Sequence, residues 1–471
     1  MDGKVEEKLD VDEEAYDMLF SPVTPWPCLS LDFILNKHGE GHPSVGDAKK
    51  KEGGCSPVTY PLQITCVAGS QAAKGNQNEI YLLRWDNLNK LKAGDEDSDE
   101  DSDEDSDGDS DEHSGDGYGH GNGGSAQGDL VREKKANGVH APDAGRKKEQ
   151  VVCKSIKHPY GGLNRIKTCK KINSLIATWC EDSNVYIYEL SEEMRHVDER
   201  PYNEEVVNKP LHVFNGHTTE GFSLDWNPVH AAKLLSGDNN GQLFLWLPDN
   251  NDKWAYEKCN IEVAADQSDD RSGGKGKGKK KHSIEDVQWV KGGNGFGHVF
   301  AMCSSDKSVR IVDSRDLKNK KNETDGRNDS TQIHIAEAHA SDVNVIAWNE
   351  KVPFLIASGG DDSVVKIWDV RNVSTSVGAL KFHKRPISAV SWDCHDAYVI
   401  LAASLDNSIS IWDLSVETES LEFGLSKYPD QLLFEHLNQK FITDAKFHPL
   451  YPGVVVSTSS DNFNIFKPCN V

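Results

Sequence analysis

The chain has 471 residues, a formal net charge of −24 and a sequence pI near 5.2. Its first residues, MDGKVEEK, hold no apolar core, and no run approaches the roughly 18 apolar residues of a membrane span, so neither a secretory signal nor a membrane helix is expected. The ten cysteines include no Cys-x-x-Cys pair, which indicates buried thiols rather than disulfides or a metal site. We therefore expect a soluble intracellular protein that needs no metal or other cofactor.

The amino-terminal segment, residues 1–25, is predicted to form an α-helix that packs its apolar face on the main body. Apolar side chains recur at helical spacing before the prolines that end the pattern: Val11, Ala15, Met18 and Leu19. The opposite face carries three carboxylates that are candidates for contact with a partner: Glu13, Glu14 and Asp17.

Residues 26–91 are predicted to form strands that complete the fold built by the rest of the chain. Three segments alternate apolar and polar side chains, as half-buried strands do: residues 26–33, 62–67 and 80–85. Together they form one incomplete repeat of a unit that recurs later.

Residues 92–150 differ in composition from both flanks, and we predict that this insertion is disordered. Within it, positions 95–112, hereafter the acidic tract, contain only Asp, Glu, Ser and Gly, which cannot bury a core. Such a polyanion favours a basic partner, although a solubilising spacer is the alternative interpretation. The candidate client-binding residues are its thirteen carboxylates: Asp95, Glu96, Asp97, Asp99, Glu100, Asp101, Asp103, Glu104, Asp105, Asp107, Asp109, Asp111 and Glu112.

Three serines of the acidic tract are candidate phosphorylation sites. Ser98, Ser102 and Ser106 each precede an acidic residue by three positions, a context that acid-directed kinases favour. Each phosphate would add about −1.5 to −2 charges to the tract.

Residues 151–471 contain six repeats of short strands. A histidine precedes a tryptophan by 29 residues in three of them, at His217, His339 and His383, and Trp368 and Trp412 are 44 residues apart. Four-stranded propeller blades repeat every ~40–45 residues. The six repeats and the amino-terminal strands therefore predict a seven-bladed, all-β propeller, in which an amino-terminal strand pairs with the last blade and removes an open edge.

The repeated His, Ser, Asp and Trp residues are predicted to be structural. A catalytic triad is needed once, whereas these residues recur at one phase of each repeat, with Asp238, Asp361 and Asp406 as the carboxylates. We expect them to tie each turn to its strands by hydrogen bonds while the tryptophans pack between blades. No His-Glu-x-x-His or phosphate-loop motif accompanies them. The sequence predicts a binding protein and no enzyme.

The repeats resemble WD-repeat propellers, and particular segments narrow the resemblance. Residues 26–31 and 216–228 resemble histone chaperones related to the retinoblastoma-binding proteins, as does the amino-terminal segment. The acidic insertion, residues 247–254 and residues 431–466 resemble the glutamate-rich WD-repeat protein family of ribosome biogenesis.

This resemblance implies a chaperone for a newly made, very basic large-subunit ribosomal protein. It implies location in the nucleus and nucleolus, with some cytoplasmic pool, and histones as further partners. In the histone chaperones, a histone helix docks between the amino-terminal helix and an acidic, double-proline loop. The corresponding residues 426–431 here read SKYPDQ, with one proline and a lysine, which weakens the histone interpretation.

A second functional class is suggested by the sequence Trp368-Asp369-Val370-Arg371. It resembles the adaptor-docking box of substrate receptors for cullin-four ubiquitin ligases, and Arg315 closes a poorer copy. Arg371 would then present its planar cation to the adaptor. The alternative is that an arginine after the Trp-Asp pair only caps a blade turn.

Overall fold

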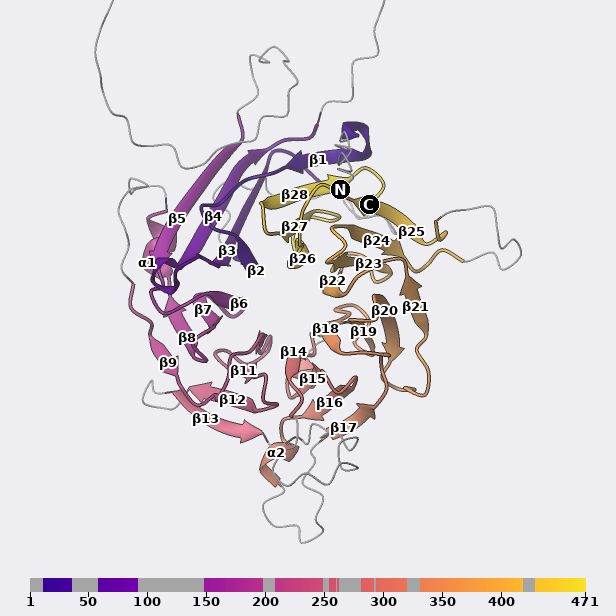
Figure 1. Ribbon diagram of the computed structural model, residues 1–471. Helices are drawn as coiled ribbons and strands as arrows, with labels where there is room; N and C mark the ends of the chain where they lie inside the picture. The colour runs from indigo at the N-terminus through magenta and orange to yellow at the C-terminus, as the bar shows by residue number, and fades with distance from the viewer. Residues whose placement is uncertain are drawn as a thin grey trace, which may run out of the picture.

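The computed structural model describes residues 12–35, 58–91, 148–197, 208–248, 254–259, 261, 281–291, 294–319, 331–417 and 428–471. These residues form seven four-stranded antiparallel sheets, arranged as blades around an axis (Figure 1). The predicted all-β, seven-bladed propeller is confirmed. No helix in the described part of the chain combines the length and apolar character that a membrane crossing needs.

The strands of each blade run in order from the innermost to the outermost. Blade 1 consists of β2 (Cys28–Phe33), β3 (Leu62–Ser70), β4 (Glu79–Leu88) and β5 (Gln150–Lys157), and blade 2 of β6 (Leu163–Cys169), β7 (Ile172–Cys180), β8 (Val185–Glu189) and β9 (His212–Phe214). Blade 3 consists of β10 (Ser223–Trp226), β11 (Leu234–Gly237), β12 (Leu243–Pro248) and β13 (Trp254–Cys259). Blade 4 consists of β14 (Ile284–Trp289), β15 (Val299–Ser304), β16 (Val309–Asp313) and β17 (Thr331–Ile335).

Blades 5 to 7 follow the same order, and the last takes its outer strand from the amino-terminal part of the chain. Blade 5 consists of β18 (Val343–Trp348), β19 (Leu355–Gly360), β20 (Val364–Asp369) and β21 (Gly378–Lys381). Blade 6 consists of β22 (Ile387–Trp392), β23 (Val399–Ser404), β24 (Ile409–Asp413) and β25 (Leu432–His436). Blade 7 consists of β26 (Asp444–Phe447), β27 (Val455–Thr458), β28 (Phe463–Pro468) and β1 (Tyr16–Phe20). The described helices are short: η1 (Glu13–Ala15), η2 (Gly75–Gln77), α1 (Ser191–Arg195), η3 (Asn294–Phe296) and α2 (Asp316–Asn319).

The antiparallel order gives the ring two distinct faces. Connections from the first to the second strand, and from the third to the fourth, lie at one face, which we call the cavity face. Turns between the second and third strands, and the links between blades, lie at the other, which we call the turn face. The acidic tract falls between β4 and β5, so the described chain leaves and re-enters the ring at the cavity face.

The α-helix predicted within residues 1–25 is wrong for the described residues. Only Glu13–Ala15 forms a helical turn, and Tyr16–Phe20 is strand β1, paired antiparallel with β28. The Tyr16 hydroxyl and His436 Nδ1 lie 2.8 Å apart, and Met18 is buried. The open edge of β28 supplies hydrogen bonds in register, whereas so short a helix has little stability of its own. The expectation that an amino-terminal strand completes the last blade is confirmed.

Blade 1 is assembled across the acidic insertion. Strands β2 to β4 come from residues 26–91, which were predicted to form an incomplete repeat, and β5 pairs with β4 from Glu79 opposite Lys157 to Asp86 opposite Gln150. The first strand after the insertion therefore belongs to the blade before it.

The predicted hydrogen-bond network is confirmed in the regular repeats. In blade 5, His339 Nε2 lies 2.7 Å from Ser358 Oγ, to which Trp368 Nε1 donates at 2.9 Å. The same arrangement occurs in blade 3 with His217, Ser236 and Trp246. In blade 6, His383 and Trp412 contact Ser410, which lies on the third strand instead of the second. These tryptophans are buried, and Trp246 packs in a cluster shared by blades 2 and 3.

One carboxylate of this network was predicted incorrectly. His339 Nδ1 lies 2.9 Å from Asp362, not Asp361, and Asp361 instead accepts from Asn344 Nδ2 at 2.8 Å. The separation of 23 residues between His339 and Asp362 equals that between His383 and Asp406. In blade 3 the carboxylate partner of His217 is Asp238, 21 residues later, so the position of this carboxylate varies between repeats.

Blade 4 lacks the tryptophan and contains a buried ion pair. Val312 takes the position of the tryptophan and is fully buried. Arg310, 2% exposed, places Nη2 2.6 Å from Asp306 Oδ2 in the preceding turn. A cation and a carboxylate thus join the turn to the strand, as the His–Ser–Trp contacts do in blades 3, 5 and 6.

Candidate functional site

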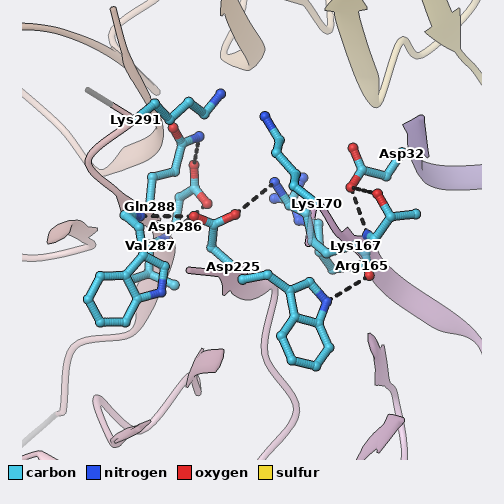
Figure 2. Close-up of polar contacts among 12 residues, drawn as sticks. Asp32, Arg165, Lys167, Lys170, Asp225, Asp286, Val287, Gln288 and Lys291 are labelled. Atoms are coloured by element: carbon cyan, nitrogen blue, oxygen red, sulfur yellow. Dashed lines mark hydrogen bonds and ion pairs between the residues drawn. The ribbon is translucent and has the colours of Figure 1, made fainter. Parts of the chain in front are cut away.

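Carboxylates on the inner strands connect neighbouring blades around the axis. Inner strands pair on one side only, so side chains accept hydrogen bonds from the unpaired N–H groups of the adjoining blade. Asp225 Oδ2 accepts from Trp289 N at 2.9 Å, and Figure 2 shows this contact together with the corresponding one at Asp32. The full set comprises Asp32 with Thr168 N, Asp225 with Trp289 N, Asp286 with Ile346 N and Asp444 with Leu31 N, at 2.8 to 3.2 Å.

The role of Asp32 and Asp225 was not predicted from the sequence. A signal for it exists in a repeated tetrapeptide, Ser-Leu-Asp followed by an aromatic residue, at positions 30–33 and 223–226. A carboxylate inside an otherwise apolar strand needs a partner, and here the partner is the neighbouring backbone.

A cavity of about 130 Å³ opens along the axis at the cavity face. Its walls include Trp226, Trp348 and Trp392, whose indole N–H groups donate to carbonyls of adjoining inner strands at 3.0 to 3.2 Å. The rings therefore present apolar surface to the cavity. Phe33 and Phe447 complete this aromatic wall.

Two lysines share one carboxylate at the mouth of this axial cavity. Lys170 Nζ and Lys291 Nζ lie 3.6 and 3.4 Å from Glu350 Oε1. Burial would raise the pKa of Glu350, but Lys291 and Lys170 outweigh it and hold the pKa at about 2. Burial and the like charge of Lys170 lower the pKa of Lys291. The two ammonium groups share Glu350 as their ion-pair partner. Burial would lower the pKa of Lys170, but Glu350, Asp32 and Asp225 outweigh it and raise that pKa.

Charges deeper in the axial cavity are balanced. Lys167 Nζ lies 3.8 Å from Asp225, and Lys446 Nζ lies 3.2 Å from Asp444 and 3.7 Å from Asp32. Burial raises the pKa of Asp225, whereas Lys446 and Lys167 overcome burial at Asp32 and lower its pKa. These pairs hold the inner strands in register.

Acidic side chains gather at the turn face. Burial raises the pKa of Glu285, and the negative charges of Asp342 and Asp361 raise it further. Glu285 and Asp342 line an open hollow at this face. Lys281 and His282 line the same hollow, and Arg165 lowers the pKa of Glu285, so these carboxylates already have cationic neighbours within the ring.

One group of side chains in the described residues has donor atoms spaced as metal ligands are. Atoms of Asp393, Cys394 and His395 lie within 4.8 Å of one another. However, Cys394 Sγ donates to Pro449 O at 3.3 Å, and burial raises the pKa of its thiol to about 11. His395 N closes a local turn on Asp393 Oδ1 at 2.8 Å. These contacts account for the group as a hydrogen-bonded turn.

The two arginines of the proposed adaptor box fold back on the blade. Arg371 makes a bidentate pair with Asp369, with Nη2 to Oδ2 at 2.5 Å, and its guanidinium lies 3.6 Å from the Phe354 ring centroid. Arg315 pairs with Asp313 in the same way. Both arginine side chains remain about two-thirds exposed, at 64% and 66%. Trp368 is buried, so only the Asp–Arg pairs are available to a partner.

The three amino-terminal carboxylates differ in their exposure to solvent and in their contacts with the ring. Glu13 and Glu14 are exposed on η1. Asp17 on β1 forms ion pairs with Lys90 at 2.9 Å and Lys467 at 3.2 Å. Asp17 is therefore engaged within the ring, whereas the two glutamates are accessible.

Other predicted sites lie outside the described residues. They are the acidic tract, with Ser98, Ser102 and Ser106, and the part of the 426–431 loop before Tyr428.

Two family models match the chain. One, described as the histone-binding protein RBBP4 or a subunit of the CAF1 complex, covers residues 6–89. The other, the WD domain with G-beta repeats, covers residues 330–369 and 374–413.

Three curated proteins are similar over nearly the whole chain. Glutamate-rich WD repeat-containing protein 1 of Dictyostelium discoideum is 35% identical, over 99% of this chain and 83% of that protein. Protein HEAT STRESS TOLERANT DWD 1 of Arabidopsis thaliana is 30% identical, over 99% and 89%. Ribosome assembly protein rrb1 of Schizosaccharomyces pombe is 30% identical, over 99% and 83%.

Proposed function

The chain belongs to the family of glutamate-rich WD-repeat proteins, and we propose that it is a non-enzymatic chaperone for a very basic large-subunit ribosomal protein. The observation that carries this proposal is similarity along 99% of the chain to a protein named for ribosome assembly. We expect it to act in the nucleus and nucleolus, with some cytoplasmic pool.

The chemistry of the chain supports a basic client. Ribosomal proteins carry dense Lys and Arg surfaces that adhere to any nucleic acid. A polyanion such as the acidic tract screens these charges without fixed geometry, while a rigid ring supplies specific contacts.

Affinity purification of the full chain from its native cells at moderate salt tests this function. One basic ribosomal protein should be recovered stoichiometrically. Deleting residues 95–112 should weaken the complex and reduce the dependence of its affinity on salt, because fewer ion pairs form. Unchanged binding would leave the acidic tract as a spacer, and recovery without any ribosomal protein would refute the proposal.

Histones are proposed as further partners because the histone-binding model covers residues 6–89. The accessible carboxylates for such a contact are Glu13 and Glu14, since Asp17 is paired within the ring. Replacing both glutamates with Gln should reduce histone binding in a pull-down, and Asp17→Asn should instead reduce stability.

The alternative function is a substrate receptor for a cullin-four ubiquitin ligase. The exposed Asp369–Arg371 pair favours it, as does similarity to a protein whose name contains DWD. Co-purification of the ligase adaptor, lost on Arg371→Ala and retained on Arg315→Ala, would support this function. Retention on Arg371→Ala would leave Arg371 as the cap of a blade turn.

A further inference from the structure

The mouth of the axial cavity holds more positive charge than its single carboxylate balances. Among the described residues, four lysines and three carboxylates line the cavity. The deeper Lys167 and Lys446 are paired with Asp225, Asp32 and Asp444. Lys170 and Lys291, hereafter the lysine pair, share one ion-pair partner, Glu350. In a chain whose net charge is −24, this is a local cationic site.

The geometry leaves donor capacity at the lysine pair. Each ammonium has three N–H groups. Both contacts to Glu350 Oε1, at 3.4 and 3.6 Å, exceed the usual hydrogen-bond range of about 2.7–3.2 Å. A second carboxylate placed between the nitrogens, opposite Glu350, would offset both the burial and the repulsion by Lys170 that lower the pKa of Lys291.

The lysine pair is also accessible. The side chains of Lys170 and Lys291 are 48% and 31% exposed, and Figure 2 shows the amine ends of both in the upper part of the view. They come from the ends of inner strands in blades 2 and 4, at the cavity face. Lys171 and Lys351, next to Lys170 and Glu350 in the chain, add further positive charge to the same turns.

The chain itself contains an anion tethered to this face. The acidic tract lies between β4 and β5, which end and begin at the cavity face. Its eighteen residues can extend about 60 Å, and tethering gives it a high effective concentration at the mouth.

We propose that Lys170 and Lys291 form a carboxylate-binding site at the mouth of the axial cavity, and that its occupant is the acidic tract of the same chain. Tract carboxylates lie against the two ammonium groups on the side opposite Glu350. This docking goes beyond client binding and does not depend on it. A basic client would compete with the lysine pair for the tract, so that release of the tract accompanies client loading.

Carbodiimide crosslinking of the full chain, mapped by mass spectrometry, tests the site. This reagent joins lysine amines to carboxylates in contact. At dilute protein concentration, crosslinks from Lys170 and Lys291 to residues 95–112 should exceed those from Lys171 and Lys351 about five-fold. They should be independent of protein concentration and should fall at about 0.5 M salt, because the contacts are ionic. Equal yields at all four lysines would overturn the proposal, as would crosslinks that form only between molecules.

Two variants and one control variant distinguish loss of the site from loss of folding. Glu350→Gln removes the competing carboxylate and should raise the crosslink yield from the lysine pair to the tract about two-fold or more. Lys170→Gln should lower the yield at Lys291, whereas Lys171→Gln, the neighbouring control, should not. A lower yield in Glu350→Gln with an unchanged melting temperature would contradict the site. No client is present, so failure here leaves the proposed chaperone function untouched.

Discussion

Asp361 and Asp362 are adjacent in the chain but differ in what they stabilise. Asp362 contacts His339 and also accepts from Ala340 N at 3.0 Å, whereas Asp361 is exposed and contacts Asn344. The first belongs to the network that joins a turn to the strands. The second belongs to the acidic surface of the turn face.

Asp362→Ala should therefore reduce the free energy of unfolding by about 1–2 kcal/mol, because His339 and Ala340 lose an acceptor. Asp361→Ala should stay within about 0.5 kcal/mol of the wild type. Urea denaturation of the two variants measures the difference. Equal losses would show that the hydrogen bonds of Asp362 are not the stabilising contacts.

Buried histidines give the fold a defined response to acid. Burial lowers the pKa of His158 to about 4, although Asp182 opposes the shift. The folded state thus binds the proton more weakly than the unfolded chain, whose histidine pKa is about 6.5. The contribution of neutral His158 to the free energy of unfolding is therefore fully present above about pH 6.5 and decreases as the pH falls toward 4.

His158→Gln should make the unfolding free energy less steep against pH by about 1.4 kcal/mol per pH unit between these values, since one proton fewer is taken up on unfolding. Urea denaturation at several pH values measures the slope. A slope that is the same in His158→Gln and the wild type would contradict the assignment.

Strand β1 shows where local periodicity misleads. Val11, Ala15, Met18 and Leu19 fit a helix as well as Tyr16, Met18 and Phe20 fit a strand. Pairing with the edge of β28 determines that this segment is a strand. Because β28 is over 440 residues away in the chain, a local sequence pattern does not reveal this pairing.

Removing residues 1–20 should lower the melting temperature by at least about 5 °C and promote self-association, because Met18 is lost from the core and the edge of β28 is exposed. Removing residues 1–11 is the control and should leave both unchanged. Differential scanning fluorimetry and size-exclusion chromatography provide the measurements. A stable monomer without residues 12–20 would show that β1 is dispensable for closure.

The blade count and the His–Trp network could be predicted because each is repeated in the chain. The spacing recurs at His217, His339 and His383, and this repetition favours a structural role for these residues. The lysine pair could not be predicted in this way. Lys170, Lys291 and Glu350 come from three blades and occupy no common repeat position, so only closure of the ring brings them together.

In the whole molecule, the charged groups of the propeller and those of the acidic tract have different roles. The ring fixes its charged groups in place, while the acidic tract contributes charge that phosphorylation can increase. Ser98, Ser102 and Ser106 would together add about −5 charges when modified.

Phosphorylation of these serines by an acid-directed kinase should therefore tighten binding of the basic client at physiological salt and steepen its salt dependence. Fluorescence anisotropy with labelled client compares treated and untreated protein. The triple variant Ser98→Ala, Ser102→Ala and Ser106→Ala should not respond to the kinase. Identical affinities before and after phosphate incorporation would exclude an electrostatic role for these sites.

The pairing of β1 with β28 also sets an order of events during synthesis. Leu19 lies opposite Phe466, so β1 waits for a partner strand that is synthesised more than 440 residues later. Until residues 463–468 leave the ribosome, blade 7 lacks its third strand and β1 has no sheet to join. The ring can therefore close only after β28 has been synthesised. A chain that terminates before β28 keeps β1 unpaired, and chaperones and proteases can recognise such an unpaired strand.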